Sequence, residues 1–213
     1  MIKGCIFDLD GVVVDTARYH FQAWHRLARE LGFDFTEEHN ERLKGVSRMA
    51  SLNILLEVGG LSLPDPEKQK LAAQKNEWYL EYIRKMTPAD ILPGVTEFLD
   101  LLRSVGKKIA LGTASKNARI ILTQIGLSAA FDSIVDGNRV ANAKPDPEVF
   151  LIAAADLKLE PKDCLVFEDA IAGVEAAHNG GMKCIGIGHH DILAKADKII
   201  PGFKDATLDL IEF

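Results

Sequence analysis

Short apolar runs rich in β-branched residues alternate with longer amphipathic segments along this chain of 213 residues. Four such runs stand out, at residues 5–7, 108–112, 164–167 and 184–187. Each is followed by polar or charged residues and then by a helical pattern, the arrangement that joins parallel strands through crossover helices. The pattern predicts an α/β fold, a doubly wound, Rossmann-like parallel sheet covered by helices on both faces, which residues 133–135 and 198–200 could flank or extend.

The alternation stops after the first run, and residues 15–86 show helical periodicity with no convincing strand. Side chains at spacings of three and four predict one helix that Gly32 ends. A second helix is expected to open with Asp65 as its cap residue and Pro66 at its first helical position. One face of the first helix carries Phe21, Trp24, Leu27, Ala28 and Leu31, and one face of the second carries Leu71, Lys75, Trp78, Tyr82 and Met86.

This helical stretch predicts two domains. A catalytic α/β core is expected to comprise residues 1–14 and 88–213, with a helical cap domain, residues 15–87, inserted after the first strand. The chain is expected to return to the core in a segment that is interrupted by Pro88, Pro93 and Gly94, residue types that mark turns and loops. Because both crossings would lie side by side, the insertion could move as a lid over the end of that strand.

Composition and charge restrict the classes of function. Hydrophobic residues make up 47% of the chain and charged residues 26%, a profile typical of a soluble globular protein. The formal net charge of −6 argues against binding of nucleic acid or of an anionic membrane, so any phosphate site has to be local. We expect a cytoplasmic protein with no signal peptide or membrane span, and a monomer by default. Cys5, Cys164 and Cys184 lie in apolar runs and are predicted to be buried, reduced thiols.

Two carboxylates, Asp8 and Asp10, follow directly after the first predicted strand. Ligands of doubly wound sheets bind beyond the carboxyl ends of the strands, so Asp8 is expected where a substrate arrives. The spacing lets both side chains turn toward one pocket while Leu9 faces the packing. One carboxylate can attack phosphorus to form an aspartyl-phosphate, and the other can shuttle a proton. The alternative for this motif alone is a turn or a helix cap.

A second acidic pair, Glu168 and Asp169, follows another predicted strand. Mg²⁺ prefers one or two carboxylates together with water and phosphate oxygens, and acids at neighbouring strand ends could converge to hold it. The ion would relieve the repulsion between the two acidic pairs. Taken alone, this pair could equally be the acidic first turn of a helix.

Two further strand ends carry candidate phosphate ligands. Thr113 and Ser115 offer hydroxyl groups, and the backbone amides that enter the next helix offer more donors, although such hydroxyls also occur as plain helix caps. Lys144 stands before Pro145, which holds the backbone extended. Lys144 could neutralise a transferring phosphoryl group, and its alternative is an ordinary solvated side chain.

Together these segments resemble the haloacid dehalogenase superfamily over essentially the whole chain. Its four motifs are matched in order by Asp8-Leu9-Asp10-Gly11, by Thr113 or Ser115, by Lys144-Pro145 and by Glu168-Asp169. The second aspartate resembles the phosphotransferase and phosphatase branch, and the insertion resembles the helical cap of the first class. Residues 16–24 and 43–48 are similar to cap sequences of sugar-phosphate mutases in this superfamily, as is the core segment 114–117.

The resemblance implies roles for individual residues. Asp8 would carry the phosphoryl group, and Asp10 would act as acid and base. Mg²⁺ would be held by Asp8, the Asp10 carbonyl and Asp169, with Glu168 close by. The implied catalytic residues are Asp8, Asp10, Thr16, His20, Thr113 and Lys144.

The same resemblance implies two phosphate sites and a sugar site. The transferring phosphate would be held by Thr113, Ala114 and Lys144, and the distal one by Arg48, Ser115, Lys116 and Asn117. The sugar and the domain interface would be lined by His20, Lys44, Gly45, Val46, Ser51 and Lys75, with Trp24, Ser47 and Asn76 completing the substrate-binding set.

The expected reaction interconverts β-glucose 1-phosphate and glucose 6-phosphate through β-glucose 1,6-bisphosphate. A mutase binds a bisphosphate in either orientation and needs a second phosphate site, for which Arg48 and Lys116 are candidates. The alternative is a Mg²⁺-dependent sugar-phosphate phosphatase, which needs no distal site. Lys44 and Arg48 could instead lie in a solvated loop, and His20 could be a packed interface residue. A non-catalytic binding protein is disfavoured because no catalytic position is vacant.

Overall fold

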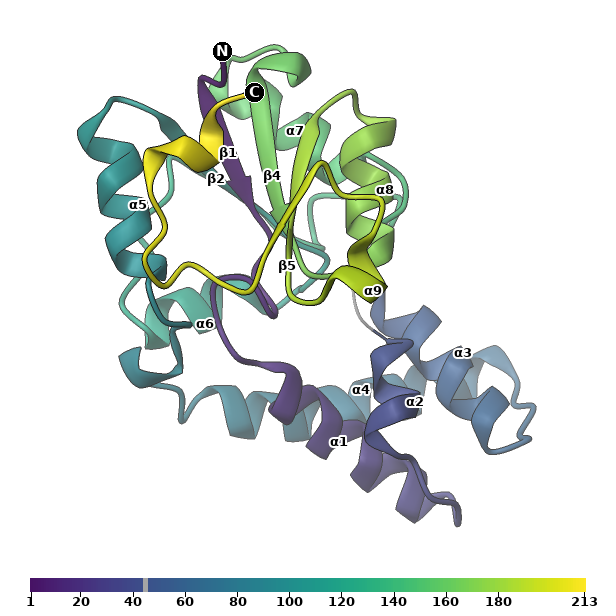
Figure 1. The fold of residues 1–213 in the computed structure, drawn as a ribbon. Helices are drawn as coiled ribbons and strands as arrows, with labels where there is room; N and C mark the ends of the chain where they lie inside the picture. Colours follow the sequence, from purple (N-terminus) through teal and green to yellow (C-terminus); the bar gives the residue numbers. More distant parts are fainter. Residues whose placement is uncertain (44–45) are drawn as a thin grey trace.

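The computed structural model describes residues 1–43 and 46–213, and its centre is a parallel sheet with the strand order β3-β2-β1-β4-β5-β6 (Figure 1). The strands are β1 (Gly4–Phe7), β2 (Lys108–Gly112), β3 (Ser133–Val135), β4 (Cys164–Glu168), β5 (Lys183–Ile187) and β6 (Lys198–Ile200). The α-helices are α1 (Ala17–Glu30), α2 (Glu37–Glu41), α3 (Arg48–Val58), α4 (Asp65–Ile83), α5 (Val95–Ser104), α6 (Ala118–Gln124), α7 (Glu148–Leu157), α8 (Ile171–Asn179) and α9 (His190–Leu193). Short 3₁₀ helices span Pro88–Asp90, Pro161–Asp163 and Leu208–Ile211. The predicted doubly wound sheet is confirmed, and the two weaker candidates are its edge strands β3 and β6.

Successive side chains of each strand enter opposite faces of the sheet, as the period of two requires. On β1, Phe7 packs on one face, where its ring stacks on Phe167 of β4 with centroids 4.6 Å apart and meets Phe98 of α5 at 6.3 Å. Ile6 belongs to the opposite face, where Phe150 of α7 lies buried. Helices α7 and α8 cover this second face, which makes a three-layer α/β/α core (Figure 1).

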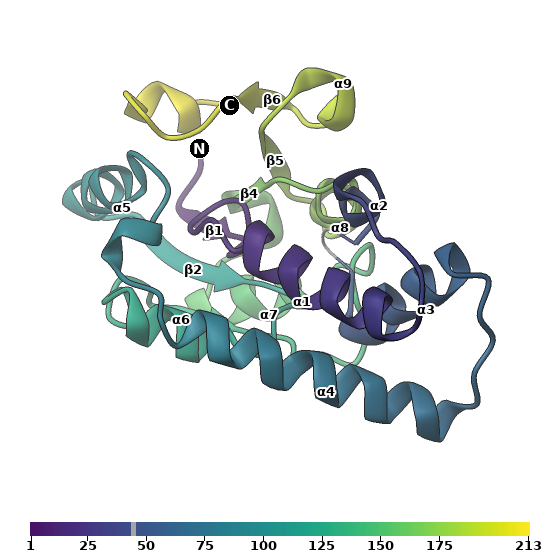
Figure 2. The same cartoon turned by 90° about the horizontal axis from the view of Figure 1, so that it is seen from below.

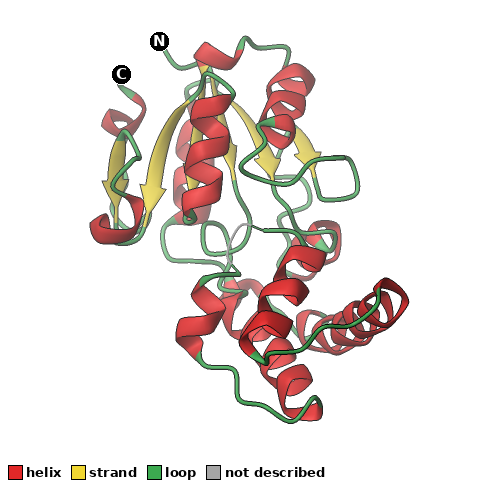
Figure 3. Ribbon diagram, turned by 90° about the vertical axis from the view of Figure 1, so that its right-hand side faces the viewer, coloured by secondary structure: helices red, strands yellow, loops and turns green. Residues whose placement is uncertain are grey.

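Helices α1 to α4 lie together beyond the carboxyl ends of the strands, toward which the strand arrows point (Figure 3). The chain enters and leaves this helical part at adjacent positions. The backbone N–H of Asp15 donates to the carbonyl of Asp90 at 3.1 Å, and that of Leu92 donates to the carbonyl of Val13 at 3.0 Å. Helix α1 runs along α4 (Figure 2). The strand ends therefore face a wall built from the inserted helices.

The two helices expected in the insertion both form, with one correction at a start. Helix α1 ends at Glu30, and Gly32 takes a positive φ of 90°, which confirms the stop. Helix α4 begins at Asp65, so its cap is the extended residue Pro64 and the assignment of Asp65 as the cap is wrong. An aspartate is favourable both as a cap and in the first helical turn, so the sequence does not separate the two positions.

The buried face of α4 also differs from the prediction. Ala72, Lys75, Trp78, Tyr79 and Ile83 are buried on this helix. Leu71 and Tyr82 are only partly buried, and Met86 is buried beyond the helix end. The buried face of α4 therefore shares Lys75 and Trp78 with the predicted face but includes Ala72 and Ile83 in place of their neighbours Leu71 and Tyr82.

Two expectations about environment can be compared with the structure. Cys5, Cys164 and Cys184 are free and buried, as predicted. Among the described helices, none has the length and apolar character needed to cross a membrane.

Candidate active site

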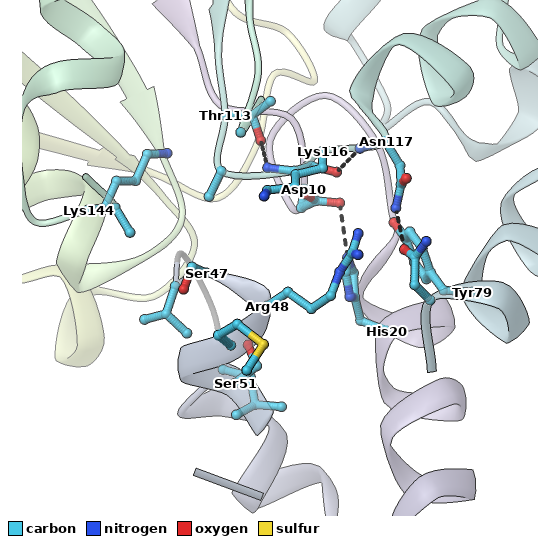
Figure 4. Close-up of a pocket in the computed structure, with 18 of the residues that line it drawn as sticks. Asp10, His20, Ser47, Arg48, Ser51, Tyr79, Thr113, Lys116, Asn117 and Lys144 are labelled. Carbon is cyan, nitrogen blue, oxygen red and sulfur yellow. Dashed lines mark hydrogen bonds and ion pairs between the residues drawn. The ribbon is translucent and has the colours of Figure 1, made fainter. Parts of the chain in front are cut away.

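A cavity of about 510 Å³ lies between the strand ends and the inserted helices (Figure 4). The residues predicted from sequence that line it are Asp8, Asp10, His20, Trp24, Val46, Ser47, Arg48, Ser51, Lys75, Asn76, Thr113, Ala114, Ser115, Lys116, Asn117, Lys144 and Asp169. Thr16 and Glu168 do not line it and contact its lining residues instead. Lys44 and Gly45 lie outside the described residues, so their predicted roles stay predictions.

Lys144 joins two strand ends at the base of the cavity. Its Nζ atom lies 2.5 Å from Oδ1 of Asp8, which follows β1, and 2.8 Å from Oε2 of Glu168, the last residue of β4. All three side chains are almost completely buried. The alternative of a solvated lysine is therefore wrong, as is the assignment of Glu168 to a helical first turn, because α8 begins only at Ile171.

Burial controls the protonation of this trio. It raises the pKa of Asp8 above its ordinary value, and Lys144 opposes the shift only in part. It also raises the pKa of Glu168 to about 8, with further contributions from Asp8 and Asp169. Burial alone would lower the pKa of Lys144, but the two carboxylates raise it. The site thus concentrates negative charge that one ammonium group does not fully neutralise.

Asp8, Glu168 and Asp169 form a carboxylate group suited to a cation. Each offers an oxygen atom, and these atoms lie within 4.8 Å of one another. The loop after β1 reaches this group through Gly11, whose φ is 78° and where an added Cβ atom would lie 2.2 Å from Oδ2 of Asp169. Clustered carboxylate oxygens are the donors that hard divalent cations prefer. The residues present therefore fit a Mg²⁺ ion.

The carboxylate of Asp10 turns away from this group toward the inserted helices. It accepts a short hydrogen bond from the hydroxyl of Thr16, and Nε2 of His20 lies 3.7 Å from the same oxygen (Figure 4). Burial would raise the pKa of Asp10, but the contacts with His20 and Thr16 lower it below its ordinary value. Asp10 is thus held ionised, as a proton acceptor must be.

A buried lysine continues this arrangement on α4. Nζ of Lys75 lies 3.1 Å from Nδ1 of His20 and rests over the rings of Trp24 and Tyr79 at 4.4 and 4.6 Å from their centroids. Burial, and to a smaller extent nearby Arg48, lowers the pKa of Lys75 to about 7. Burial and Lys75 lower the pKa of His20 as well. His20 therefore connects Asp10 to Lys75 and is more than a packed interface residue.

The loop after β2, residues 113–117, forms one wall of the cavity. Oγ1 of Thr113 accepts from the N–H of Ser115 at 3.2 Å, and Oγ of Ser115 accepts from the N–H of Asn117 at 3.3 Å. The hydroxyls therefore support local turns while facing the cavity. Nδ2 of Asn117 donates to Oδ1 of Asn76 on α4 at 3.0 Å, which connects the loop to the inserted helices.

The opposite wall is the start of α3. Ser47 caps this helix by accepting from the N–H of Ala50 at 3.3 Å. Arg48, its first residue, extends toward Asp10 and His20 (Figure 4), and burial lowers the pKa of its guanidinium group. Arg48 is only partly exposed, which disfavours an ordinary solvated loop for this residue.

Several residues that line the cavity were not predicted from the sequence. They include Asn40, Leu43, Met49, Gln69, Ala72, Ala73, Tyr79, Gly137, Val140, Asn142 and Val149. Ala72 and Tyr79 lie three residues before and four after Lys75, so helical spacing around Lys75 would have found them. The residues of the loop that follows β3 carry no such signal, because only the sheet order brings that loop beside β2.

The sheet, the four strand-end motifs and the carboxylate group define a haloacid dehalogenase-like hydrolase. The model of that family matches residues 2–181, and the chain belongs to this family of enzymes. The recognition made from the motifs is thereby confirmed. Members of the family generally use a divalent metal, with which the carboxylate group agrees.

Individual proteins of this family are similar to the chain over most of its length. The chain is 42% identical to the β-phosphoglucomutase of Bacillus subtilis over 212 residues, which cover 99% of this chain and 94% of that protein. A phosphorylated carbohydrates phosphatase of Thermotoga maritima is 34% identical over 86% of this chain and 84% of its own. The crystal structure of a β-phosphoglucomutase from Clostridium difficile superposes with a TM-score of 0.94 at 41% identity, over 99% of this chain and 96% of that one.

Proposed function

We propose that this enzyme is a β-phosphoglucomutase, which interconverts β-D-glucose 1-phosphate and glucose 6-phosphate through β-glucose 1,6-bisphosphate. The observation that carries the proposal is the presence of two groups of phosphate donors in one cavity. Lys144 and Thr113 stand beside the nucleophile, and Arg48 and Lys116 supply cations from α3 and from the loop after β2. The similarity to mutases of two bacteria supports the same assignment.

The carboxylate of Asp8 is the proposed phosphoryl carrier. In the first half-reaction a sugar hydroxyl attacks the phosphorus of phospho-Asp8, Asp10 takes the hydroxyl proton, and the bond from phosphorus to Asp8 breaks. The bisphosphate then turns over in the cavity. In the second half-reaction Asp8 attacks the other phosphate, and Asp10 returns the proton to the departing sugar oxygen. Thr16 and His20 hold Asp10 in the orientation that both steps need.

Mg²⁺ is the proposed cofactor, held by Asp8, Asp169 and the carbonyl of Asp10, with Glu168 beside it. When bound, it would supply positive charge to the phosphoryl oxygens. Lys144 contributes the same kind of charge from the protein and keeps Asp8 in place through their contact of 2.5 Å. Thr113 and Ala114 are the proposed donors to the transferring phosphate.

Residues 15–87 are the proposed cap, and residues 1–14 and 88–213 the proposed core. The contacts of His20 with Asp10 and of Asn76 with Asn117 join the two parts across the cavity. A closed cap would exclude water, which otherwise hydrolyses phospho-Asp8. The proposed sugar and distal-phosphate ligands are Trp24, Lys44, Gly45, Val46, Ser47, Arg48, Ser51, Lys75, Asn76, Ser115, Lys116 and Asn117. Free buried cysteines fit the reducing cytoplasm, which we propose as its location, and we propose a monomer by default.

A sugar-phosphate phosphatase is the second candidate, favoured by the similarity to the Thermotoga maritima phosphatase. In that reaction water, in place of a sugar hydroxyl, attacks phospho-Asp8. Phosphorus NMR separates the two candidates when the enzyme is given β-glucose 1-phosphate, Mg²⁺ and a trace of the bisphosphate. A mutase forms glucose 6-phosphate. Release of inorganic phosphate without glucose 6-phosphate would contradict the mutase and support the phosphatase.

A further inference from the structure

The turn that follows β3, residues 136–138, contacts the backbone of the cavity loop 113–117. The N–H of Gly137 donates to the carbonyl of Ser115 at 3.2 Å, and Nδ2 of Asn138 donates to the carbonyl of Lys116 at 3.0 Å. Two consecutive carbonyl groups of the cavity loop are therefore tied to one turn. A peptide group is planar, with its N–H opposite its carbonyl. Fixing the carbonyl of Ser115 toward the turn thus directs the N–H of Lys116 away from the turn.

This direction matters for phosphate binding. Lys116 lines the cavity, and no residue in the described part of the chain accepts a hydrogen bond from its backbone N–H. A backbone N–H held in a fixed direction beside a cationic side chain is a donor suited to a phosphate oxygen. The turn therefore sets the orientation of a donor that belongs to the proposed distal-phosphate group.

The turn is itself held rigidly. Asp136 is buried, its Oδ1 atom accepts from the N–H of Asn138 at 3.0 Å, and its Oδ2 atom lies 3.5 Å from Nε of Arg119 on α6. Gly137 is packed so closely that an added Cβ atom would lie 2.2 Å from the carbonyl oxygen of Ala114. That atom is backbone and cannot swing aside, so a side chain at position 137 would move the cavity loop.

The nucleophile and its ammonium partner are held independently of this turn, and so is Thr113. The N–H of Thr113 donates to the carbonyl of Val135 at 3.0 Å, as part of the pairing of β2 with β3. Asp8 and Lys144 are held by β1 and by each other. Loosening the turn should therefore affect the two phosphate sites unequally.

From these contacts we propose that Gly137 and Asn138 are positioning residues, which hold the backbone of residues 115–117 in the geometry that binds the distal phosphate. The proposal deepens the proposed mutase function and rests on it for the identity of the ligand. Neither residue is proposed to touch the reacting atoms.

The test measures the two phosphate sites separately. Binding of β-glucose 1,6-bisphosphate is measured by calorimetry in the Asp8→Asn enzyme, which cannot be phosphorylated, with and without Asn138→Ala. Chemistry at Asp8 is measured in enzyme with Asp8 intact by hydrolysis of acetyl phosphate, a donor without a second phosphate. Asn138 is exposed, so Asn138→Ala is expected to fold normally. Asn53→Ala, at an exposed position of α3, is the matched control.

We expect Asn138→Ala to raise the bisphosphate dissociation constant roughly threefold to tenfold, the range for one lost hydrogen bond. Gly137→Ala should raise it further, by roughly tenfold or more, because the loop itself is displaced. In Asn138→Ala kcat/KM for acetyl phosphate should stay within about twofold of the unsubstituted enzyme. Gly137→Ala should lower it as well, because the added Cβ displaces Ala114, a proposed donor to the transferring phosphate.

Three results would overturn the positioning role. They are an unchanged dissociation constant in both variants, an equal loss in binding and in acetyl phosphate hydrolysis in Asn138→Ala, or no measurable bisphosphate binding in the Asp8→Asn parent. Failure of the mutase proposal is a separate result, namely the absence of glucose 6-phosphate in the NMR assay. If the enzyme is a phosphatase that still binds the bisphosphate, the comparison of dissociation constants still tests the positioning role.

Discussion

Nζ of Lys144 lies 2.5 Å from Oδ1 of Asp8, and the same atom lies 2.8 Å from Oε2 of Glu168. One buried ammonium group thus pairs with two buried carboxylates at the carboxyl ends of different strands, with Asp169 beside them. Removing one partner of such a group leaves an uncompensated charge in a medium that solvates it poorly. The stability of this site and its chemistry therefore depend on the same few side chains.

Asp8→Asn should abolish turnover of sugar phosphate, by more than about a thousandfold, because an amide oxygen is a poor nucleophile toward phosphorus. The protein should stay folded with a lower melting temperature, since the amide keeps the volume of the carboxylate and Glu168 still pairs with Lys144, but the amide can accept only one of the two hydrogen bonds that Asp8 accepts from Lys144 and from the N–H of Asp10. A coupled assay of glucose 6-phosphate formation together with a thermal melt measures both. Asp100→Asn, at an exposed position of α5, is the control. Equal activity in the two variants would exclude Asp8 as the nucleophile.

Lys144→Met should destabilise the metal-free protein by roughly 3–5 kcal/mol at pH 7, because Asp8 then lacks its counter-charge and Glu168 loses its hydrogen-bond donor. The loss should shrink toward pH 5, because burial, no longer opposed by Lys144, raises the pKa of Asp8 in the folded variant, which then takes up a proton that the unfolded chain does not. Urea unfolding at both pH values measures the difference. Lys162→Met, at an exposed position, is the matched control. A loss that does not vary with pH would show that packing, and not charge, is responsible.

Mg²⁺ should stabilise the protein, by about 2.7 kcal/mol when its concentration is a hundred times the dissociation constant. In Asp169→Asn this gain should be largely lost, because the carboxylate group loses a charged donor. Urea unfolding with Mg²⁺ and with a chelator gives the two stabilities. An equal gain in Asp169→Asn would place the ion elsewhere, and Asp100→Asn should keep the full gain.

Lys75 should make stability increase with pH. Its pKa is lowered to about 7 by burial, from 10.5 in the unfolded chain, so between these values the unfolded state binds more protons than the folded state. Stability then rises with pH through this window, by up to about 1.4 kcal/mol per pH unit from this group. Urea unfolding of the unsubstituted protein and of Lys75→Met at pH 7 and pH 9.5 isolates the contribution.

Two further results decide this prediction. The free energy of unfolding of Lys75→Met minus that of the unsubstituted protein should fall as the pH rises, since the unsubstituted protein gains stability from this group and the variant does not. Lys70→Met, at an exposed position of the same helix, should show no such trend. A constant difference would mean that Lys75 stays charged in the folded protein.

Arg48→Ala should weaken mutase turnover by roughly tenfold to a hundredfold while hydrolysis of acetyl phosphate changes little. The guanidinium group is proposed to grip the distal phosphate, which acetyl phosphate lacks, and a charge-assisted pair is worth about 1.5–3 kcal/mol. Steady-state kinetics with both substrates gives the ratio. Arg42→Ala removes an exposed arginine that pairs with Glu57 and serves as the control. A parallel loss on both substrates would argue against a separate distal site.

Much of the fold follows from local pattern. The apolar runs at residues 108–112 and 164–167 predicted strands because buried parallel strands carry continuous apolar sequence. The short edge strand β3 was only a weak candidate, since three residues hold too little pattern to separate a strand from a loop. The cap of α4 was placed one residue late because Asp65 suits either position.

The identity of the residues at the site follows from the amino-acid sequence alone. Asp8 and Glu168 end parallel strands, and the carboxyl ends of such strands meet at one edge of the sheet whatever the side chains do. The contacts that each residue makes there depend on the folded structure. It turned Asp10 toward His20, buried Lys144 between two carboxylates and placed Asn138 against the cavity loop. These outcomes depend on distances between segments far apart in the chain and on exclusion of water from between them, which no local spacing of residues encodes.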